Sequence, residues 1–378
     1  MMTESRLKKR SLIFAGGGTG GHLLPGIAVA EQLASIDDFS ITFIGSNRPV
    51  EQQIIERSGY QHLGLASSPS NELKSAPWRF FWNNGHACLQ ARRILRAERP
   101  AAVIGLGGFA SVPVILAASW LKIPIVLLEQ NIIPGRANRF LFSRANVICT
   151  SFAETRLPKS HSGRPLIAFT GNPVREQMTH LETTPKNEPS EMLLLVLGGS
   201  QGARAVNQAV LSLLEQGQDA LPRRLHVVHQ TGEVDWEHAV QRYRKLQVHD
   251  SELRVTVEPF INDLAEWYSK ADLVISRAGA TTLAELACTG CPTILIPYPN
   301  SIGDHQLINA QFYEAEGAAV LVEQMADAEV TAHNLQTAVV ELLHDSAKRN
   351  SLSEVMQKLA LPEASRKVAD EIMALIAH

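Results

Sequence analysis

The sequence has few cysteines, no large excess of either charge and no long apolar run. Its four cysteines are too few for a disulfide framework, and the C-x-x-C pair Cys288 and Cys291 has no second pair with which to hold a metal. We interpret these two as small buried residues around a helix-ending Gly290. The net charge of −3 argues against a nucleic acid held by overall charge.

No segment predicts a transmembrane helix. The longest apolar stretches, Val112–Trp120 and Ile123–Leu128, are too short to span a bilayer, and each contains a proline. The basic N-terminal residues precede only Leu12–Ala15 before glycines begin, so the apolar core of a signal peptide is missing. We therefore expect the chain to be cytoplasmic.

What the sequence does have is a repeated alternation of short apolar runs with helix-length segments, which predicts parallel sheets covered by helices. The expected strands are Ser11–Ala15, Ile41–Ile44, Ala101–Ile104, Ile125–Leu128, Val147–Thr150, Met192–Leu197, His226–Gln230, Val255–Val257, Leu273–Ser276 and Thr293–Pro297, with helices at Pro25–Ala34 and from about Ala203. The polar, proline-containing stretch Glu182–Ser190 predicts a linker.

The length of 378 residues and the 45% hydrophobic content favour two globular domains. Each half opens with a strand followed by a glycine loop. The predicted fold class is therefore α/β, with two Rossmann-like domains facing a cleft, where open α/β sheets bind ligands. We expect domains at residues 1–180 and 191–345, a linker at 181–190, and C-terminal helices at 346–378 that pack back toward the first domain.

The first glycine loop, Gly16–Gly21, formally matches the dinucleotide pattern G-x-G-x-x-G. However, the second strand ends in Ile44–Asn47 without the carboxylate that would hold a ribose, and His22 follows where a P-loop needs lysine. A backbone site for phosphate or a developing anion remains. The alternative is a glycine turn needed only for packing. Similar loops at Gly105–Phe109 and Gly198–Gly202 suggest more than one phosphate group.

The segment Ser276–Ala287 follows an expected strand and begins a helix, whose positive end suits a diphosphate. Glu285 can accept hydrogen bonds from two adjacent hydroxyls, as a ribose offers. Alternatively, Thr282 and Glu285 form a capping box, and Glu285 bonds only backbone.

Six motifs occur in the same order as in the MurG family of inverting GT-B glycosyltransferases, and together they resemble it. They are Gly17–His22, Glu129–Asn131, Gly171–Arg175, Gly198–Ala203, Ser276–Glu285 and Asp304–Ala310. The resemblance implies transfer of N-acetylglucosamine from its UDP donor to lipid I, a polyprenyl-diphosphate-linked muramyl peptide, forming lipid II for peptidoglycan. It makes residues 1–180 the acceptor and membrane-facing domain and 191–345 the donor domain.

The resemblance also implies the donor contacts. The backbone of Ile261 contacts the uracil, Glu285 the ribose hydroxyls, and Asn131 and Gln306 the sugar hydroxyls. Arg175 lies near the nucleoside. Thr19, Gly20 and Gly21 line the site. Ser200 binds the diphosphate, together with the helix start formed by Ala280, Thr281, Thr282, Leu283 and Ala284. Gly18, Gly107 and Gly108 are assigned to the acceptor diphosphate. The family's acidic pair is here Gly303 and Asp304, which puts one sugar contact in doubt.

The transfer requires a base for the acceptor hydroxyl and a group that stabilises the departing UDP. His22 is the predicted base, because imidazole titrates near neutral pH; its alternative role is a structural hydrogen bond. Glu129 is the competing carboxylate. The sequence contains no Asp-x-Asp motif, so no metal or other cofactor is implied.

Trp78–Trp82 places four aromatic residues around Arg79, and Arg92, Arg93, Arg96 and Arg99 follow. Aromatic residues beside cations are typical of peripheral membrane binders. We expect Trp78, Arg79, Phe81 and Trp82 to meet the anionic cytoplasmic face of the membrane. For Ala87–Arg99 we favour a helix packed on the sheet. The open alternatives for function are another GT-B glycolipid transferase, a UDP-sugar epimerase and a non-catalytic UDP-sugar sensor.

Overall fold

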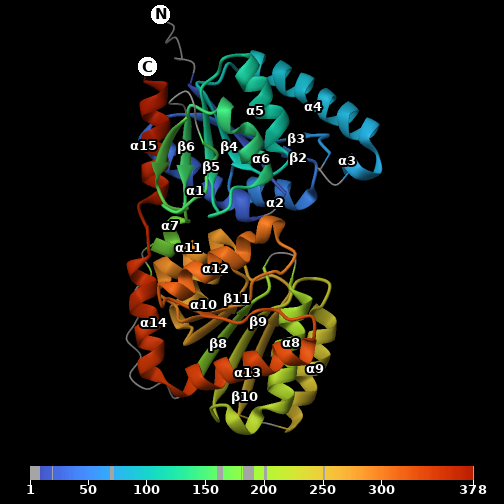
Figure 1. Cartoon of the computed structure of the whole chain (residues 1–378), viewed down its shortest axis with the longest axis vertical. Helices are drawn as coiled ribbons and strands as arrows, with labels where there is room; N and C mark the ends of the chain where they lie inside the picture. The colour runs from blue at the N-terminus through green and yellow to red at the C-terminus, as the bar shows by residue number, and fades with distance from the viewer. Residues whose placement is uncertain are drawn as a thin grey trace, which may run out of the picture. The chain divides into compact units, whose positions relative to one another are not determined.

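The computed structural model describes residues 9–18, 20–68, 72–159, 165–179, 181, 191–199, 202–249 and 252–377. The chain forms two compact units, which Figure 1 shows with their elements labelled. The first comprises Met1–Arg175 together with Pro362–His378, and the second comprises Glu176–Leu361. Each unit contains one parallel sheet covered by helices, which confirms the predicted pair of Rossmann-like domains.

The sheet of the first unit has the strand order β3-β2-β1-β4-β5-β6-β7, and every pairing is parallel. Its strands are β1 (Ser11–Gly16), β2 (Ser40–Ser46), β3 (Gln61–Leu65), β4 (Ala102–Gly107), β5 (Ile125–Glu129), β6 (Val147–Thr150) and β7 (Leu166–Phe169). The sequence did not predict β3 or β7. Both lie at sheet edges, where a strand needs no continuous apolar run.

Helices cover both faces of this sheet. Leu12 and Phe14 of β1 point into one core cluster with helix α1, whereas Ile13 and Ala15 point into another with α4 and α5. The helices of this unit are α1 (Gly20–Ile36), α2 (Pro49–Arg57), α3 (Glu72–Ser75), α4 (Pro77–Glu98), α5 (Ser111–Trp120), α6 (Arg136–Leu141), the 3-10 helix η1 (Phe142–Arg144) and α15 (Ala364–Ile376). Helix α1 begins at Gly20, five residues before the predicted start at Pro25, which lies inside it.

Helix α15 belongs to the first unit although it ends the chain (Figure 1). It packs on α1, and its Val368, Ala369 and Ile372 are fully buried in the cluster that contains Leu12. The hydroxyl of Ser365 also donates to the carbonyl of Val174, at 3.2 Å.

The second unit has the strand order β10-β9-β8-β11-β12-β13, again all parallel. Its strands are β8 (Met192–Leu197), β9 (Leu225–Gln230), β10 (Leu253–Glu258), β11 (Leu273–Ser276), β12 (Thr293–Leu295) and β13 (Val320–Leu321). Its helices are α7 (Glu176–Thr179), α8 (Arg204–Gln216), η2 (Gln218–Ala220), α9 (Trp236–His249), α10 (Leu264–Lys270), α11 (Ala280–Thr289), η3 (Ile302–Asp304), α12 (His305–Ala315), α13 (Ala328–His344) and α14 (Ser346–Lys358).

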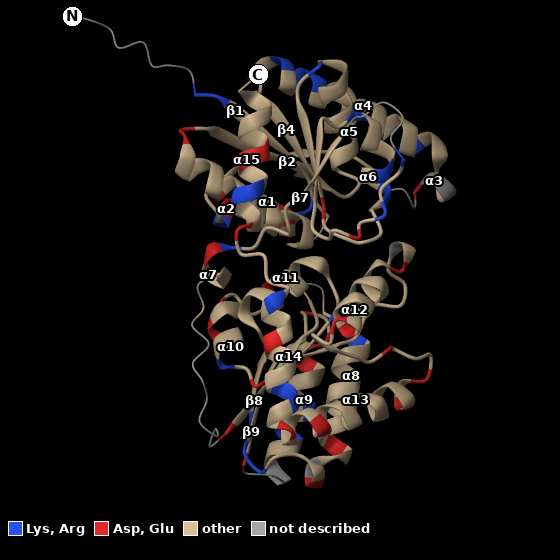
Figure 2. Ribbon diagram, turned by 60° about the vertical axis from the view of Figure 1, so that its left-hand side comes forward, with Lys and Arg blue, Asp and Glu red and all other residues tan. Residues whose placement is uncertain are grey.

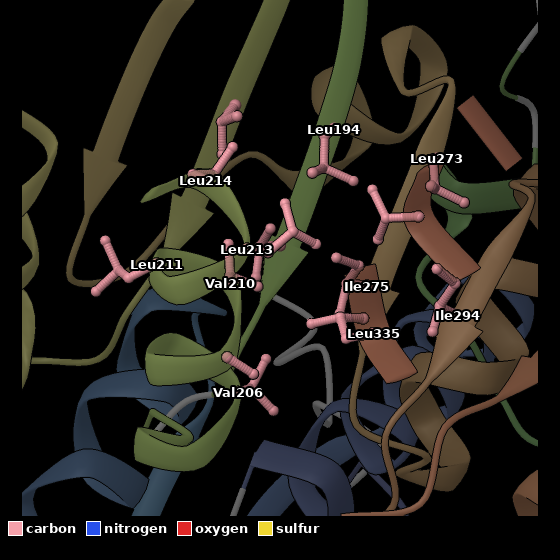
Figure 3. Packing of buried hydrophobic residues seen from close by; sticks show 14 of the residues in the cluster. Leu194, Val206, Val210, Leu211, Leu213, Leu214, Leu273, Ile275, Ile294 and Leu335 are labelled. Carbon is pink, nitrogen blue, oxygen red and sulfur yellow. The ribbon is translucent and has the colours of Figure 1, made fainter. Parts of the chain in front are cut away.

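One face of this sheet packs against α8 and α13. Figure 3 shows Leu194, Ile275 and Ile294 of the strands close to Val210 and Leu335 of the helices. All five side chains are fully buried. Burial of each such side chain is worth roughly 1.5–3 kcal/mol, so the strands of this unit are held by a continuous aliphatic core.

The observed units correct the predicted domain boundaries. The first unit ends at Arg175 and not at residue 180, because α7 contacts α11 of the second unit. The segment 346–378 is divided between the units. Helix α14 packs on α11 and α13 in the second unit, and only α15 joins the first. The linker expected at 181–190 lies outside the described residues, apart from Leu181.

We predict that Ile372→Ala destabilises the first unit by about 2–5 kcal/mol, because it opens a cavity under α1. Hydrogen exchange, measured peptide by peptide, should accelerate in β1 and β4 and remain unchanged in β8 and β11. Asp370→Ala, at an exposed position of the same helix, is the matched control. Equal acceleration in both sheets would contradict the assignment of α15 to the first unit.

Candidate functional site

The first two glycine loops meet backbone to backbone at the carboxyl ends of β1 and β4. A Cβ atom placed on Gly108 would lie 2.5 Å from the carbonyl oxygen of Gly17, and Gly108 has φ +74°. Gly18 and Gly107 also have positive φ, of +104° and +94°. The structure thus brings together Gly18, Gly107 and Gly108, the three glycines assigned to the acceptor diphosphate. Only glycine permits both this contact and these φ values.

His22 lies beside this junction. Gly20, Gly21 and His22 form the first turn of α1, while Thr19 lies outside the described residues. The imidazole is half-buried, and a Cβ on Gly107 would lie 3.0 Å from its Cδ2 and 3.4 Å from its Nε2. The predicted base therefore contacts the second glycine loop while belonging to the helix that follows the first.

Glu129, the competing carboxylate, is almost completely buried at the end of β5. Its Oε1 accepts from the amide of Asn131 at 3.0 Å, and its Oε2 accepts from the amide of Gly135 at 3.0 Å and from Nδ2 of Asn138 at 2.9 Å. Burial raises the pKa of this carboxyl, and the hydrogen bonds oppose that rise. Both oxygens are engaged in shaping the loop that carries the half-buried Asn131.

Two side chains from the start of α2, both missed in the sequence, hold the first loop. The buried carboxylate of Glu51 accepts from the amide of Gly18 at 2.6 Å. Arg48 Nη1 donates to the carbonyl of Gly18 at 3.0 Å, and its guanidinium lies 5.5 Å from the centre of the Phe109 ring. No local pattern identifies these residues, because their partners lie in loops that are distant in sequence.

In the second unit, Gln230 connects two predicted donor segments. Its Nε2 donates to the carbonyl of Gly199 in the third glycine loop, and its Oε1 accepts from the amide of Ile261, both at 3.0 Å. Gly202 of this loop needs to be glycine, since a Cβ there would lie 2.4 Å from the carbonyl of Thr231. Ser200 lies outside the described residues.

The start of helix α11 tests the capping-box hypothesis for Glu285. Gly279 occupies the N-cap position without a side-chain cap, and the helix begins at Ala280. Thr282 therefore lies inside the first turn and is not an N-cap, so the capping-box alternative is wrong. Glu285 is only 4% exposed, and its Oε2 accepts from the Tyr268 hydroxyl at 3.4 Å. The residues from Ala280 to Ala284 lie on the preceding turns.

Arg277 fixes the loop that leads from β12 to Gln306. Its Nη1 donates to the carbonyls of Ile296 and Pro297, at 2.9 and 3.1 Å, and burial lowers its pKa to about 10. Gln306 in turn accepts from the amide of Tyr298 at 2.9 Å. The sequence does not reveal this role of Arg277, because its partners Ile296 and Pro297 follow another strand.

Other predicted sites are placed as follows. Arg175 is half-buried at the end of the first unit. Trp78, Phe81 and Trp82 at the start of α4 are 72%, 65% and 76% exposed, and Arg79 is exposed too. Farther along α4, Ala87, Ala91 and Leu95 are buried, as predicted. None of the helices in the described parts of the chain is long and apolar enough to span a membrane.

Cys88, Cys149 and Cys291 are buried, and Cys288 is partly buried. Within the described ranges, no three His, Cys, Asp or Glu side chains are grouped to hold a metal ion.

The chain matches two family models that together cover most of its length. Residues 12–150 match the glycosyltransferase family 28 N-terminal domain, and residues 193–371 match the C-terminal domain of the same family. The crystal structure of Acinetobacter baumannii MurG aligns with a TM-score of 0.75 and 27% identity, covering 97% of this chain and 99% of that one.

Two relatives share the same name, UDP-N-acetylglucosamine–N-acetylmuramyl-(pentapeptide) pyrophosphoryl-undecaprenol N-acetylglucosamine transferase. The relative from Desulfotalea psychrophila is 37% identical over 99% of both chains. That from Halothermothrix orenii is 35% identical over 93% of this chain and 95% of its own. The resemblance predicted from the motifs is thereby confirmed: the chain belongs to glycosyltransferase family 28 and, within it, to the MurG family of N-acetylglucosamine transferases.

Proposed function

We propose that this protein transfers N-acetylglucosamine from UDP-N-acetylglucosamine to the muramyl 4-hydroxyl of lipid I, forming lipid II and UDP. The observation that carries the proposal is family membership across both units. Both units are needed because the proposed donor helix α11 lies in the second and the proposed base His22 lies in the first.

The contacts of the second unit to the uracil, ribose and diphosphate of the donor are proposed as follows. Glu285 accepts hydrogen bonds from the ribose hydroxyls, a role supported by its burial beside Tyr268 and by the absence of a capping role. The amide of Ile261 already donates to Gln230, so we assign the uracil contact to the carbonyl of Ile261, which can accept from the N–H of the base. The diphosphate lies at the amides of Ala280–Leu283, where the helix dipole favours negative charge.

The reaction is a single displacement. His22 removes the proton from the acceptor hydroxyl, whose oxygen then bonds to the anomeric carbon of the donor sugar. The bond from that carbon to the UDP oxygen breaks on the opposite side, which inverts the configuration. The N-terminus of α11 and the third glycine loop stabilise the negative charge on the departing UDP. Amides of the first two glycine loops bind the acceptor diphosphate, other than the amide of Gly18, which donates to Glu51.

The membrane contact is proposed for α4. Trp78, Trp82 and Leu89 are exposed and recur at a spacing that places them on one face of the helix. The charged residues of α4 are Arg79, Arg92, Arg93, Arg96 and Glu98, so cations predominate (Figure 2). Exposed aromatic residues with neighbouring arginines suit the headgroup region of an anionic cytoplasmic leaflet, where the lipid acceptor resides.

The direct test is incubation of the protein with labelled UDP-N-acetylglucosamine and lipid I. We predict a labelled lipid product with inverted configuration and stoichiometric release of UDP. Diacylglycerol in place of lipid I should give no product. Labelled diacylglycerol would instead identify another glycolipid transferase. Conversion of the donor sugar without an acceptor would identify an epimerase, and UDP-sugar binding without turnover would identify a sensor.

A pair of variants separates donor binding from chemistry. Glu285→Ala should weaken UDP binding by about 1.5–3 kcal/mol, the usual value of a hydrogen bond to a charged group. His22→Ala should leave UDP affinity unchanged but lower turnover by about 10²–10⁴-fold, the usual contribution of a general base. Calorimetry and steady-state kinetics measure both. If Glu285→Ala lowers only the melting temperature, its role is structural; near-normal turnover of His22→Ala returns the base role to Glu129.

We predict that a Trp78→Ser/Phe81→Ser/Trp82→Ser variant loses most of its binding to anionic vesicles. The wild type should retain part of its binding at high salt, because salt screens the arginines but not aromatic burial. The control replaces three exposed apolar residues of the second unit, Val234, Met325 and Val330, with serine. Co-sedimentation compares the three proteins. Equal binding by all three places the membrane contact outside α4.

A further inference from the structure

Glu51 is a fully buried carboxylate that does not belong to the proposed chemistry. It lies in the first turn of α2, where a glutamate on a surface helix is normally solvated. Its Oε1 accepts from the amide of Gly18 and from the hydroxyl of Ser46, both at 2.6 Å, and its Oε2 accepts from the amide of Ser46 at 2.8 Å. The carboxylate thus joins the loop after β1 to the end of β2.

The neighbouring backbone leaves room for this carboxylate. A Cβ on Gly17 would lie 2.4 Å from Glu51 Oε2, and one on Gly45 would lie 2.6 Å from the same oxygen. Such distances are too short for a side chain at either position, because three hydrogen bonds prevent the carboxylate from moving aside. Gly17 and Gly45 therefore have to be glycine for the Glu51 carboxylate to lie between them.

The two residues at the start of α2 fix Gly18 from both sides. Glu51 accepts from its amide, and Arg48 donates to its carbonyl at 3.0 Å. Gly18 has φ +104°. Glycine can adopt this conformation but does not enforce it, so contacts such as these have to fix the direction of the following peptide. Two residues later the chain enters α1, which carries His22.

We propose that Glu51 is a positioning residue: it sets the conformation of the first glycine loop and so aligns the acceptor diphosphate and hydroxyl with His22. The identity of the acceptor in this proposal rests on the proposed function. The role of Glu51 in setting the loop conformation does not. Glu51 contacts no reacting atom and acts only through Gly18 and the loop that follows.

Glu51→Gln tests this with a nearly isosteric side chain. Both carboxylate oxygens accept from backbone amides, so in either orientation the glutamine NH2 group would face an amide donor of Gly18 or Ser46. We expect kcat/KM for the acceptor to fall about 10²-fold, as misplacement of a reacting group does. UDP affinity should be unchanged, because the proposed contacts of Ile261, Glu285 and helix α11 to the uracil, ribose and diphosphate are in the second unit. Hydrogen exchange in the peptide Gly16–Leu23 should accelerate.

Two controls separate positioning from general stability. Ser46→Ala removes only the hydroxyl contact and keeps both amide bonds to Glu51, so it should retain most of the acceptor kcat/KM. Ile55→Ala opens the core beneath the same helix without touching the loop, and its activity at a temperature well below its Tm should be near normal.

The proposal is overturned if Glu51→Gln matches Ile55→Ala in acceptor kcat/KM, or if exchange in Gly16–Leu23 is the same as in the wild type. It is supported if Glu51→Gln alone combines lost acceptor kcat/KM, unchanged UDP affinity and faster exchange. If the wild type transfers no sugar to lipid I, the proposed function fails, while the exchange measurement still decides whether Glu51 holds the loop.

Discussion

The close approach of Gly17 and Gly108 is the constraint on which the site of the first unit depends. Parallel strands β1 and β4 are neighbours, so the loops at their carboxyl ends emerge side by side. A Cβ atom on Gly108 would lie only 2.5 Å from the carbonyl oxygen of Gly17, so no side chain fits at this position. The same arrangement brings the imidazole of His22 against Gly107. Two amide-lined loops and a titratable group therefore meet at one point.

Three buried glutamates show how the same side chain serves different purposes in this protein. Glu51 and Glu129 each accept two backbone amides, and each thereby shapes a loop that begins at the end of a strand. Glu285 lies on a helix and accepts from a tyrosine hydroxyl. Glu51 and Glu129 are proposed or seen to hold loops through backbone amides, whereas Glu285 is proposed to accept from ribose hydroxyls.

In the second unit, a neutral and a cationic side chain hold loops through backbone hydrogen bonds, as Glu51 and Glu129 do in the first. Gln230 joins the third glycine loop to Ile261, and Arg277 joins the start of α11 to the loop before Gln306. Both side chains bond mainly to backbone at the carboxyl edge of the sheet. Loops there have no regular hydrogen-bond partners of their own, so side chains from adjacent strands satisfy and fix them. The segments proposed to contact uracil, diphosphate and sugar are thus connected through the protein interior.

The sequence by itself determined the two parallel α/β units, the glycine loops and the helix that begins near Ala280, because each depends on local composition and short spacing. It also determined the family, because six ordered motifs do not recur by chance. Only the tertiary structure decided which unit α14 and α15 join, since their amphipathic patterns do not specify a partner. It alone showed Gly279 and not Thr282 at the N-cap, and found Glu51, Arg48 and Gln230. These residues act through hydrogen bonds to backbone about thirty residues away in sequence, and no local pattern encodes a contact formed only when separate strands align.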